Sequence, residues 1–145
     1  MDPMNSWFRF LCLTLSFLWV STSFAIDKEC WNESKACMLA GSLELHTYPG
    51  GRTNSKGDDI LETNLYLKIE PSVTVHFKDF DNNDAPATEL VTLMEVAGDF
   101  DSHLFKVAKR KNHATVKATI FGQQTGHHHT HFLIDARNNI VVNKK

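Results

Sequence analysis

The chain has 145 residues with 15 basic and 17 acidic side chains, so its formal net charge at pH 7 is −2. Non-specific binding to nucleic acid needs a strong basic excess, and this balance argues against a nucleic-acid partner. About 120 residues remain after the signal peptide that is described below. They suit one domain, because two domains of half that size would each lack a sufficient core.

The first 25 residues have the layout of a secretory signal peptide. Arg9 precedes an uncharged run from Phe10 to Val20, and small residues lead up to Ala25. This layout predicts export with cleavage after Ala25. A membrane anchor is the alternative, but a span needs about 20 apolar residues. We therefore expect a periplasmic or secreted domain over residues 26–145, with no membrane insertion after cleavage.

Two cysteines remain once the leader, which contains Cys12, is removed. Cys30 and Cys37 form an even pair in an oxidising compartment, and we expect a disulfide that closes a short loop. Metal ligation together with histidines, or two free thiols, are the alternatives. The spacing is longer than the two to four residues typical of zinc sites, which favours the disulfide.

The first half of the chain predicts three strands. Alternating apolar and polar residues indicate a strand over Gly41–Tyr48, followed by a long polar loop from about Tyr48 to Leu61. A second strand covers 65–70; Pro71 interrupts it, and 73–77 form an extension or a separate strand. A polar loop over 79–84 then leads to a third strand over 89–96.

The second half begins with a helical period and then returns to strands. Residues 100–108 predict a helix of about three turns, with Asp99 and Asp101 at its amino end. Strands over 113–121 and 132–135 follow, and 140–142 can join the last one. This order predicts a mainly β domain, a small five-stranded OB-like barrel with one α-helix between strands three and four. A different small barrel, or a sheet with one helix packed on it, is the alternative.

Four of the eight histidines lie close together in the stretch Thr125-Gly126-His127-His128-His129-Thr130-His131. A neutral imidazole is a common metal ligand and titrates near neutral pH. In an extended segment, His129 and His131 point to one side with Cα atoms about 6.6 Å apart. With His127 they could form a zinc or copper site.

Two other interpretations of the histidine cluster stay open. Imidazole and threonine side chains could pair backbone groups that a turn at Gly126 leaves without partners, which would make the segment structural. The cluster could also form a proton-sensitive contact.

On an OB-fold, the connections after strands one and four border the ligand groove. We therefore expect the two polar connections of this chain to meet at one rim of the barrel. Their candidate ligand-binding residues are Tyr48, Arg52, Asp58, Asp59, Thr125 and His128.

Catalytic motifs are not found. The sequence has no serine-hydrolase elbow, phosphate-binding glycine loop or metalloprotease helix, and its cysteine pair is not a C-x-x-C redox motif. We expect a protein that is not an enzyme and has no catalytic residues. A metal-dependent hydrolase would require a bound ion that activates water at an open position.

The segment from Val116 to Asp135, VKATIFGQQTGHHHTHFLID, resembles an uncharacterised family of small exported bacterial domains, a domain of unknown function. Its members are similar in carrying a Thr-Gly-His-His-His-Thr signature between two apolar strands. Residues 39–50 resemble the family's opening strand and Pro-Gly turn, and 57–67 its second motif. His131 stands where the pattern expects proline. The resemblance implies a periplasmic or envelope location and no particular activity.

Two functions follow as hypotheses. The first is an exported, non-enzymatic binding module that contacts a protein or cell-envelope ligand through loops at one rim, immunity and inhibitor proteins included. The second is a periplasmic zinc- or copper-binding protein that uses the cluster from His127 to His131.

Overall fold

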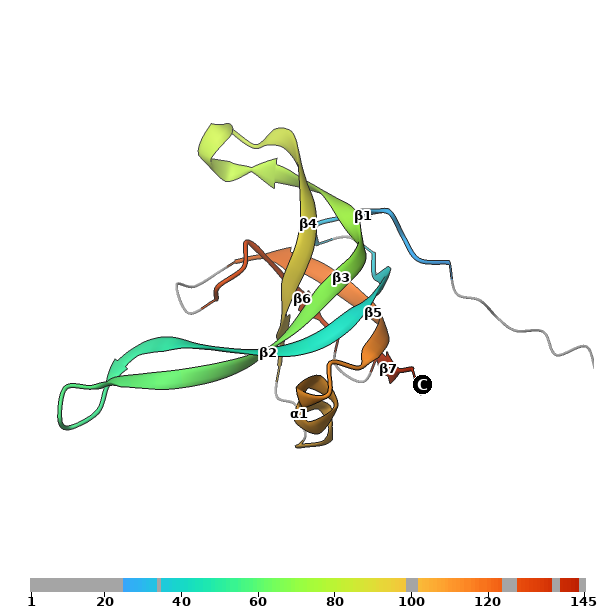
Figure 1. Cartoon of the computed structure of the whole chain (residues 1–145). Helices are drawn as coiled ribbons and strands as arrows, with labels where there is room; N and C mark the ends of the chain where they lie inside the picture. Colours follow the sequence, from blue (N-terminus) through green and yellow to red (C-terminus); the bar gives the residue numbers. More distant parts are fainter. Residues whose placement is uncertain (1–24, 34, 99–101, 124–127, 137–138, 144–145) are drawn as a thin grey trace, which may run out of the picture.

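In the computed structural model, the described residues are 25–33, 35–98, 102–123, 128–136 and 139–143. The expected signal peptide, up to residue 24, lies outside them. The described part of the chain is mainly β with one α-helix (Figure 1). No helix within it is long and apolar enough to cross a membrane.

Seven strands and one α-helix occur in these ranges. In chain order they are β1 Glu29–Trp31, β2 Cys37–Thr53, β3 Asp59–Asp79, β4 Ala85–Ala97, α1 Ser102–Lys109, β5 His113–Gly122, β6 Phe132–Asp135 and β7 Ile140–Val142. A short 3-10 turn over Phe80–Asn82 connects β3 to β4.

Five of the strands form a closed ring. β2 pairs antiparallel with both β3 and β5, and β5 pairs antiparallel with β6. β4 completes the ring because it pairs parallel with β6 and antiparallel with β3. β1 adds to β3 in parallel, and β7 adds to β5. Closure of the ring leaves few strand edges open to other chains.

The helix position differs from the prediction. α1 lies between β4 and β5, the fourth and fifth strands, rather than between the third and fourth. The count shifts because β1 has only three residues, too few for an alternating pattern to reveal. β7 is indeed a strand, but its partner is β5 and not β6. The described part of the helix has eight residues, about two turns. Asp99 and Asp101, expected at its amino end, lie outside the described residues.

The polar loop expected between residues 48 and 61 is instead a hairpin arm. β2 and β3 stay paired as far as Thr53 and Asp59, and the arm projects from the ring (Figure 1). Its turn is closed by Asn54, whose Oδ1 accepts from the backbone nitrogens of Lys56 and Asp58. Gly57 has a φ of 87°, which glycine adopts without strain. The sequence looked like a loop because most side chains near the end of the arm are polar and exposed.

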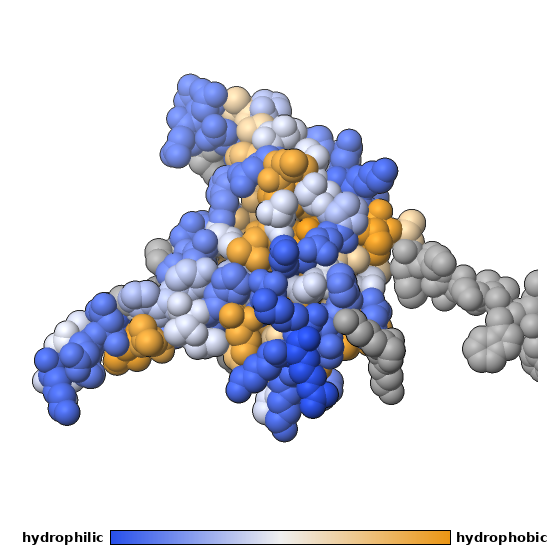
Figure 2. Space-filling model, viewed as in Figure 1, coloured by the Kyte–Doolittle hydropathy of each residue, from blue (hydrophilic) through white to orange (hydrophobic). Residues whose placement is uncertain are grey.

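The surface of the arm is not uniformly polar. Figure 2 shows a hydrophilic tip and an apolar patch further along the arm. The large exposed apolar side chains of the arm are Ile60 and Leu61.

β3 passes Pro71 without a break, so 73–77 are an extension of the second predicted strand. Its pairing with β4 shifts register between Lys68 and Val73. Proline has no N–H to offer a neighbouring strand, which explains an irregularity at this point.

The hydrophobic core fills the inside of the ring. Its largest fully buried side chains include Leu39, Leu43, Leu65, Leu67, Val73, Val75, Met94, Ile120, Phe132 and Ile134. α1 contributes Val107 and Ala108. The predicted Cys30–Cys37 disulfide is present and joins the same core. A disulfide is consistent with an extracellular or periplasmic location.

Candidate functional site

The site is centred on Glu95 of β4, a charged side chain that is only 4% exposed. Its neighbours Met94 and Val96 belong to the core. Because successive side chains of a strand point to opposite faces, Glu95 projects from the outer face of the ring. A buried charge is costly unless polar groups compensate it, so its partners determine what the site is.

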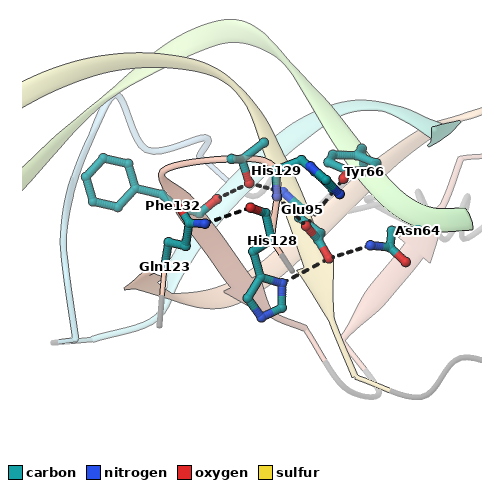
Figure 3. Close-up of polar contacts among 8 residues, drawn as sticks. Asn64, Tyr66, Glu95, Gln123, His128, His129 and Phe132 are labelled. Atoms are coloured by element: carbon teal, nitrogen blue, oxygen red, sulfur yellow. Dashed lines mark hydrogen bonds and ion pairs between the residues drawn. The ribbon is translucent and has the colours of Figure 1, made fainter. Parts of the chain in front are cut away.

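Four donors surround the carboxylate (Figure 3). Oε1 accepts from Asn64 Nδ2 at 3.0 Å and lies 3.1 Å from His128 Nδ1. Oε2 accepts from the Tyr66 hydroxyl at 3.3 Å and from the backbone nitrogen of His129 at 3.2 Å. An ionised carboxylate only accepts, so this set matches a charged Glu95 and places the His128 proton on Nδ1. In the neutral ring, the Nε2 atom of His128 is then an acceptor.

Strand register brings Asn64 and Tyr66 to this point. Tyr66 lies opposite Glu95 in the β3–β4 pairing, and Asn64 is two residues earlier on the same face. Tyr66 is fully buried although it lies outside the contiguous hydrophobic cluster. Burial, and next the charge of Glu95, raise the pKa of Tyr66 well above its ordinary value. The hydroxyl therefore stays protonated and can donate to the carboxylate.

Further hydrogen bonds hold the histidine segment, residues 128–131, over this face of the sheet. Thr130 Oγ1 accepts from the Glu95 backbone nitrogen at 3.0 Å and donates to the Phe132 carbonyl at 2.7 Å. Gln123 Nε2 donates to the His128 carbonyl at 2.7 Å. Thr130 thus pairs backbone groups of Glu95 and Phe132, which do not belong to the turn expected at Gly126. Residues 125–127 lie outside the described residues.

An aromatic cluster covers the outer side of the site. The His129 ring stacks on Tyr48, with ring centroids 3.9 Å apart. His46 lies 4.7 Å from Tyr66 by ring centroids, and its Nδ1 atom is 3.3 Å from the Tyr48 hydroxyl. The two connections thus meet as predicted at Tyr48, but through paired strand at the base of the arm and not through a loop.

His131 has different neighbours from His129. Its Nδ1 atom is 2.6 Å from Glu89 Oε2, and its ring packs edge-on against Phe77. The expectation that His129 and His131 present their rings together is therefore not met. Within the described ranges, no three His, Cys, Asp or Glu side chains are grouped so that they could hold a metal ion. His127, the third predicted ligand, is outside those ranges.

The other predicted ligand-binding residues separate into two places. His128 and Tyr48 belong to the site. Arg52, Asp58 and Asp59 are exposed near the end of the arm, where Asp58 Oδ2 accepts from Asn54 Nδ2. The arm carries these three residues away from the ring (Figure 1). Thr125 lies outside the described residues.

Sequence reasoning missed Asn64, Tyr66 and Glu95. A signal for Glu95 was available, because it is a single charge within the apolar run Leu93–Val96. Tyr66 alternates with the core residues Leu65 and Leu67, a pattern typical of an exposed position, but it is buried and contacts His46 and Glu95.

The site offers hydrogen-bonding and aromatic groups held in fixed positions. A neutral imidazole whose Nδ1–H is held by a carboxylate presents Nε2 as an acceptor for a ligand. Comparison of the chain with known protein families, with curated proteins and with solved structures gave no match.

Proposed function

We propose that the protein is an exported, non-enzymatic binding module that recognises a protein or cell-envelope ligand through Tyr48, His128 and His129. The observation that carries the proposal is the buried Glu95 carboxylate, whose hydrogen bonds hold the His128 ring and the backbone of His129. Tyr48 stacks on the His129 ring. Groups that are held in place before binding lose less entropy when the ligand arrives. Tyrosine is also enriched among the residues that dominate protein interfaces.

An OB-type barrel is the second part of the proposal. OB-folds bind ligands on strands two and three, between the loops that follow strands one and four. If the short strands β1 and β7 are left out of the count, strands two and three correspond to β3 and β4. The loops after strands one and four then correspond to the arm and to the β5–β6 connection. Asn64, Tyr66 and Glu95 stand on those two strands, and His128 belongs to that connection. Their location supports a ligand-binding role for this face.

Export is the third part of the proposal. The leader-like first 25 residues and the resemblance to small exported domains support it. The Cys30–Cys37 disulfide is consistent with it.

Affinity capture from envelope extract tests the recognition surface. The wild-type protein and a Tyr48→Ala/His129→Ala variant are immobilised in parallel, with Val141→Ala as control because Val141 is exposed on β7 outside the site. We expect a ligand that wild type and control retain equally and that the double variant binds at least about tenfold more weakly. If every retained component binds all three proteins equally, this surface is not the recognition site.

Zinc or copper binding is the second candidate function, and one contact favours it. A metal-ligating histidine usually donates its other ring N–H to a carboxylate, as His128 does to Glu95. Calorimetric titration of the two ions into the purified protein tests this function. We expect wild-type binding that the His128→Ala variant loses; affinity weaker than about 10 µM would reject it.

A further inference from the structure

A groove of about 800 Å³ lies between β1 and the β3–β4 hairpin. None of the residues of the Glu95 site lines it. Its lining residues are Trp31, Asn32, Glu33, His76, Phe77, Lys78, Asp84, Pro86, Ala87 and Thr88. This volume falls in the range of about 300–1,000 Å³ that small-ligand sites occupy.

One wall of the groove is a flat aromatic platform. Trp31 is 48% exposed, and its ring stacks on His76 with centroids 4.7 Å apart and an interplanar angle of 10°. The Nε2 atom of His76 lies 3.6 Å from Glu29 Oε2, which is beyond hydrogen-bond distance. A large indole left half in water gains free energy when a ligand covers it.

The backbone beneath the platform is fixed on several sides. Cys30, next to Trp31, is buried and bonded to Cys37. The Asn32 nitrogen donates to the His76 carbonyl at 2.9 Å, and the Glu33 nitrogen donates to the Ile120 carbonyl at 2.7 Å. The segment is therefore tied to β3 and to β5. Such a platform is arranged before any ligand binds, which reduces the entropy cost of binding.

The polar groups of the groove select the class of ligand. Glu33 and Asp84 only accept hydrogen bonds, Lys78 only donates them, and Thr88 does both. Sugar hydroxyls satisfy both kinds of partner, while the C–H face of a sugar ring can pack on the electron-rich face of an indole. An aromatic peptide would also pack on the indole, but its backbone offers one donor and one acceptor per residue, fewer hydrogen-bonding groups than the hydroxyls of a sugar ring offer. Two carboxylates against one ammonium disfavour an anionic ligand.

We propose that this groove binds a neutral oligosaccharide, with one sugar ring packed on Trp31 and its hydroxyls bonded to Glu33, Lys78 and Asp84. This site is independent of the Glu95 site and does not rest on the function proposed for it.

Tryptophan fluorescence tests the proposal, because the chain has only three tryptophans, Trp7, Trp19 and Trp31. The full chain with Trp7→Phe and Trp19→Phe keeps a single indole in the groove. Chitotriose, cellotriose and maltotriose are titrated separately to about 10 mM. We expect a saturable change of emission toward shorter wavelength with at least one of them, since a sugar ring displaces water from the indole.

Matched variants locate the binding. Glu33→Gln and Asp84→Asn keep the side-chain shape, and each should weaken binding at least fivefold. Leu90→Ala removes an exposed apolar side chain that does not line the groove, and Tyr48→Ala alters the other site; both should bind as the parent does. Saturation-transfer NMR follows sugar binding to Trp31→Ala and Trp31→Phe, where the indole is gone. Loss in the alanine variant with partial retention in the phenylalanine variant is expected.

Three results would each overturn the proposal. One is the lack of a saturable response to all three sugars. Another is unchanged sugar binding by Trp31→Ala. The third is an emission shift produced by an aromatic tripeptide or an anionic trisaccharide when none of the neutral sugars produces one.

Discussion

Replacing Glu95 by glutamine should destabilise the protein and release the histidine segment, although the two side chains have nearly the same shape. Glutamine exchanges one acceptor oxygen for an NH₂ donor. At the Oε2 position this donor would face the backbone N–H of His129, which cannot become an acceptor. At the Oε1 position the NH₂ group would face Asn64 and His128. Asn64 can present its oxygen if its amide turns over, and His128 can present an unprotonated Nδ1 if its ring changes tautomer.

The size of the effect follows from the hydrogen bonds. A bond to a charged group contributes about 1.5–3 kcal/mol, and a neutral one about 0.5–1.5 kcal/mol. Four bonds lose charge assistance, while the amide is cheaper to bury than the carboxylate. We therefore expect Glu95→Gln to lower the free energy of unfolding by about 1–3 kcal/mol. Glu95→Ala should cost about 3–5 kcal/mol, because it leaves all four donors without their acceptor.

Urea denaturation measures these losses, and ¹⁵N NMR of the imidazoles reports the tautomer of His128. The matched control is Glu89→Gln, which makes the same change at the exposed contact with His131 and should cost less than about 1 kcal/mol. The wild-type His128 proton should lie on Nδ1 and move to Nε2 in Glu95→Gln. Equal stability losses in the two glutamine variants, with no tautomer change, would refute this account of the site.

Three more predictions concern the ring and its surroundings. The pKa of Tyr66 is raised in the folded state, so its contribution to stability should be intact below the ordinary tyrosine pKa of about 10 and should be lost as the pH rises above that value. The urea midpoints at pH 8 and pH 11 should therefore differ more for wild type than for Tyr66→Phe. Gly41→Ala should prevent folding or cost several kcal/mol, on the order of 2–4, because a Cβ there meets the Lys68 carbonyl, whereas Gly122→Ala has open space and should be tolerated in thermal melts. Cys30→Ser/Cys37→Ser should lose about 2.5 kcal/mol in denaturant unfolding, and reducing agent should then have no further effect on the folded domain.

The alternation of side chains predicted most of the strands, because the strands that line the core have one apolar and one polar face. Leu65 and Leu67 in β3, and Val116 and Ile120 in β5, show this pattern and are buried. The outer part of the arm was not predicted as strand because most of its side chains are exposed to water, and the residues from Arg52 to Asp59 therefore show no alternation of apolar and polar side chains. β1 was not predicted because it has only three residues, and its formation depends on pairing with β3, which is distant in the sequence.

The site was harder to predict for a similar reason. The histidine segment stood out in composition, but its geometry depends on Glu95, which lies 33 residues before His128 in the chain. Tyr66 contacts His46 and Tyr48 of β2, and Glu95 contacts His128 and the backbone of His129. Contacts between residues that are far apart in the chain leave no local periodicity in the sequence.

Variants of the Glu95 site and of its surface can distinguish a recognition role from a stabilising one. A buried charge contributes little net stability, and well-packed apolar residues often replace one without loss. Here a single apolar replacement would leave the donors of Asn64, Tyr66 and two histidines without an acceptor. The main effect of the carboxylate is therefore to hold these donor groups in place rather than to add net stability. Tyr48 and His129 lie outside that hydrogen-bond set except for one backbone N–H. Their alanine variants should therefore lose ligand while keeping the stability that Glu95→Gln loses, a separation that a purely structural cluster would not produce.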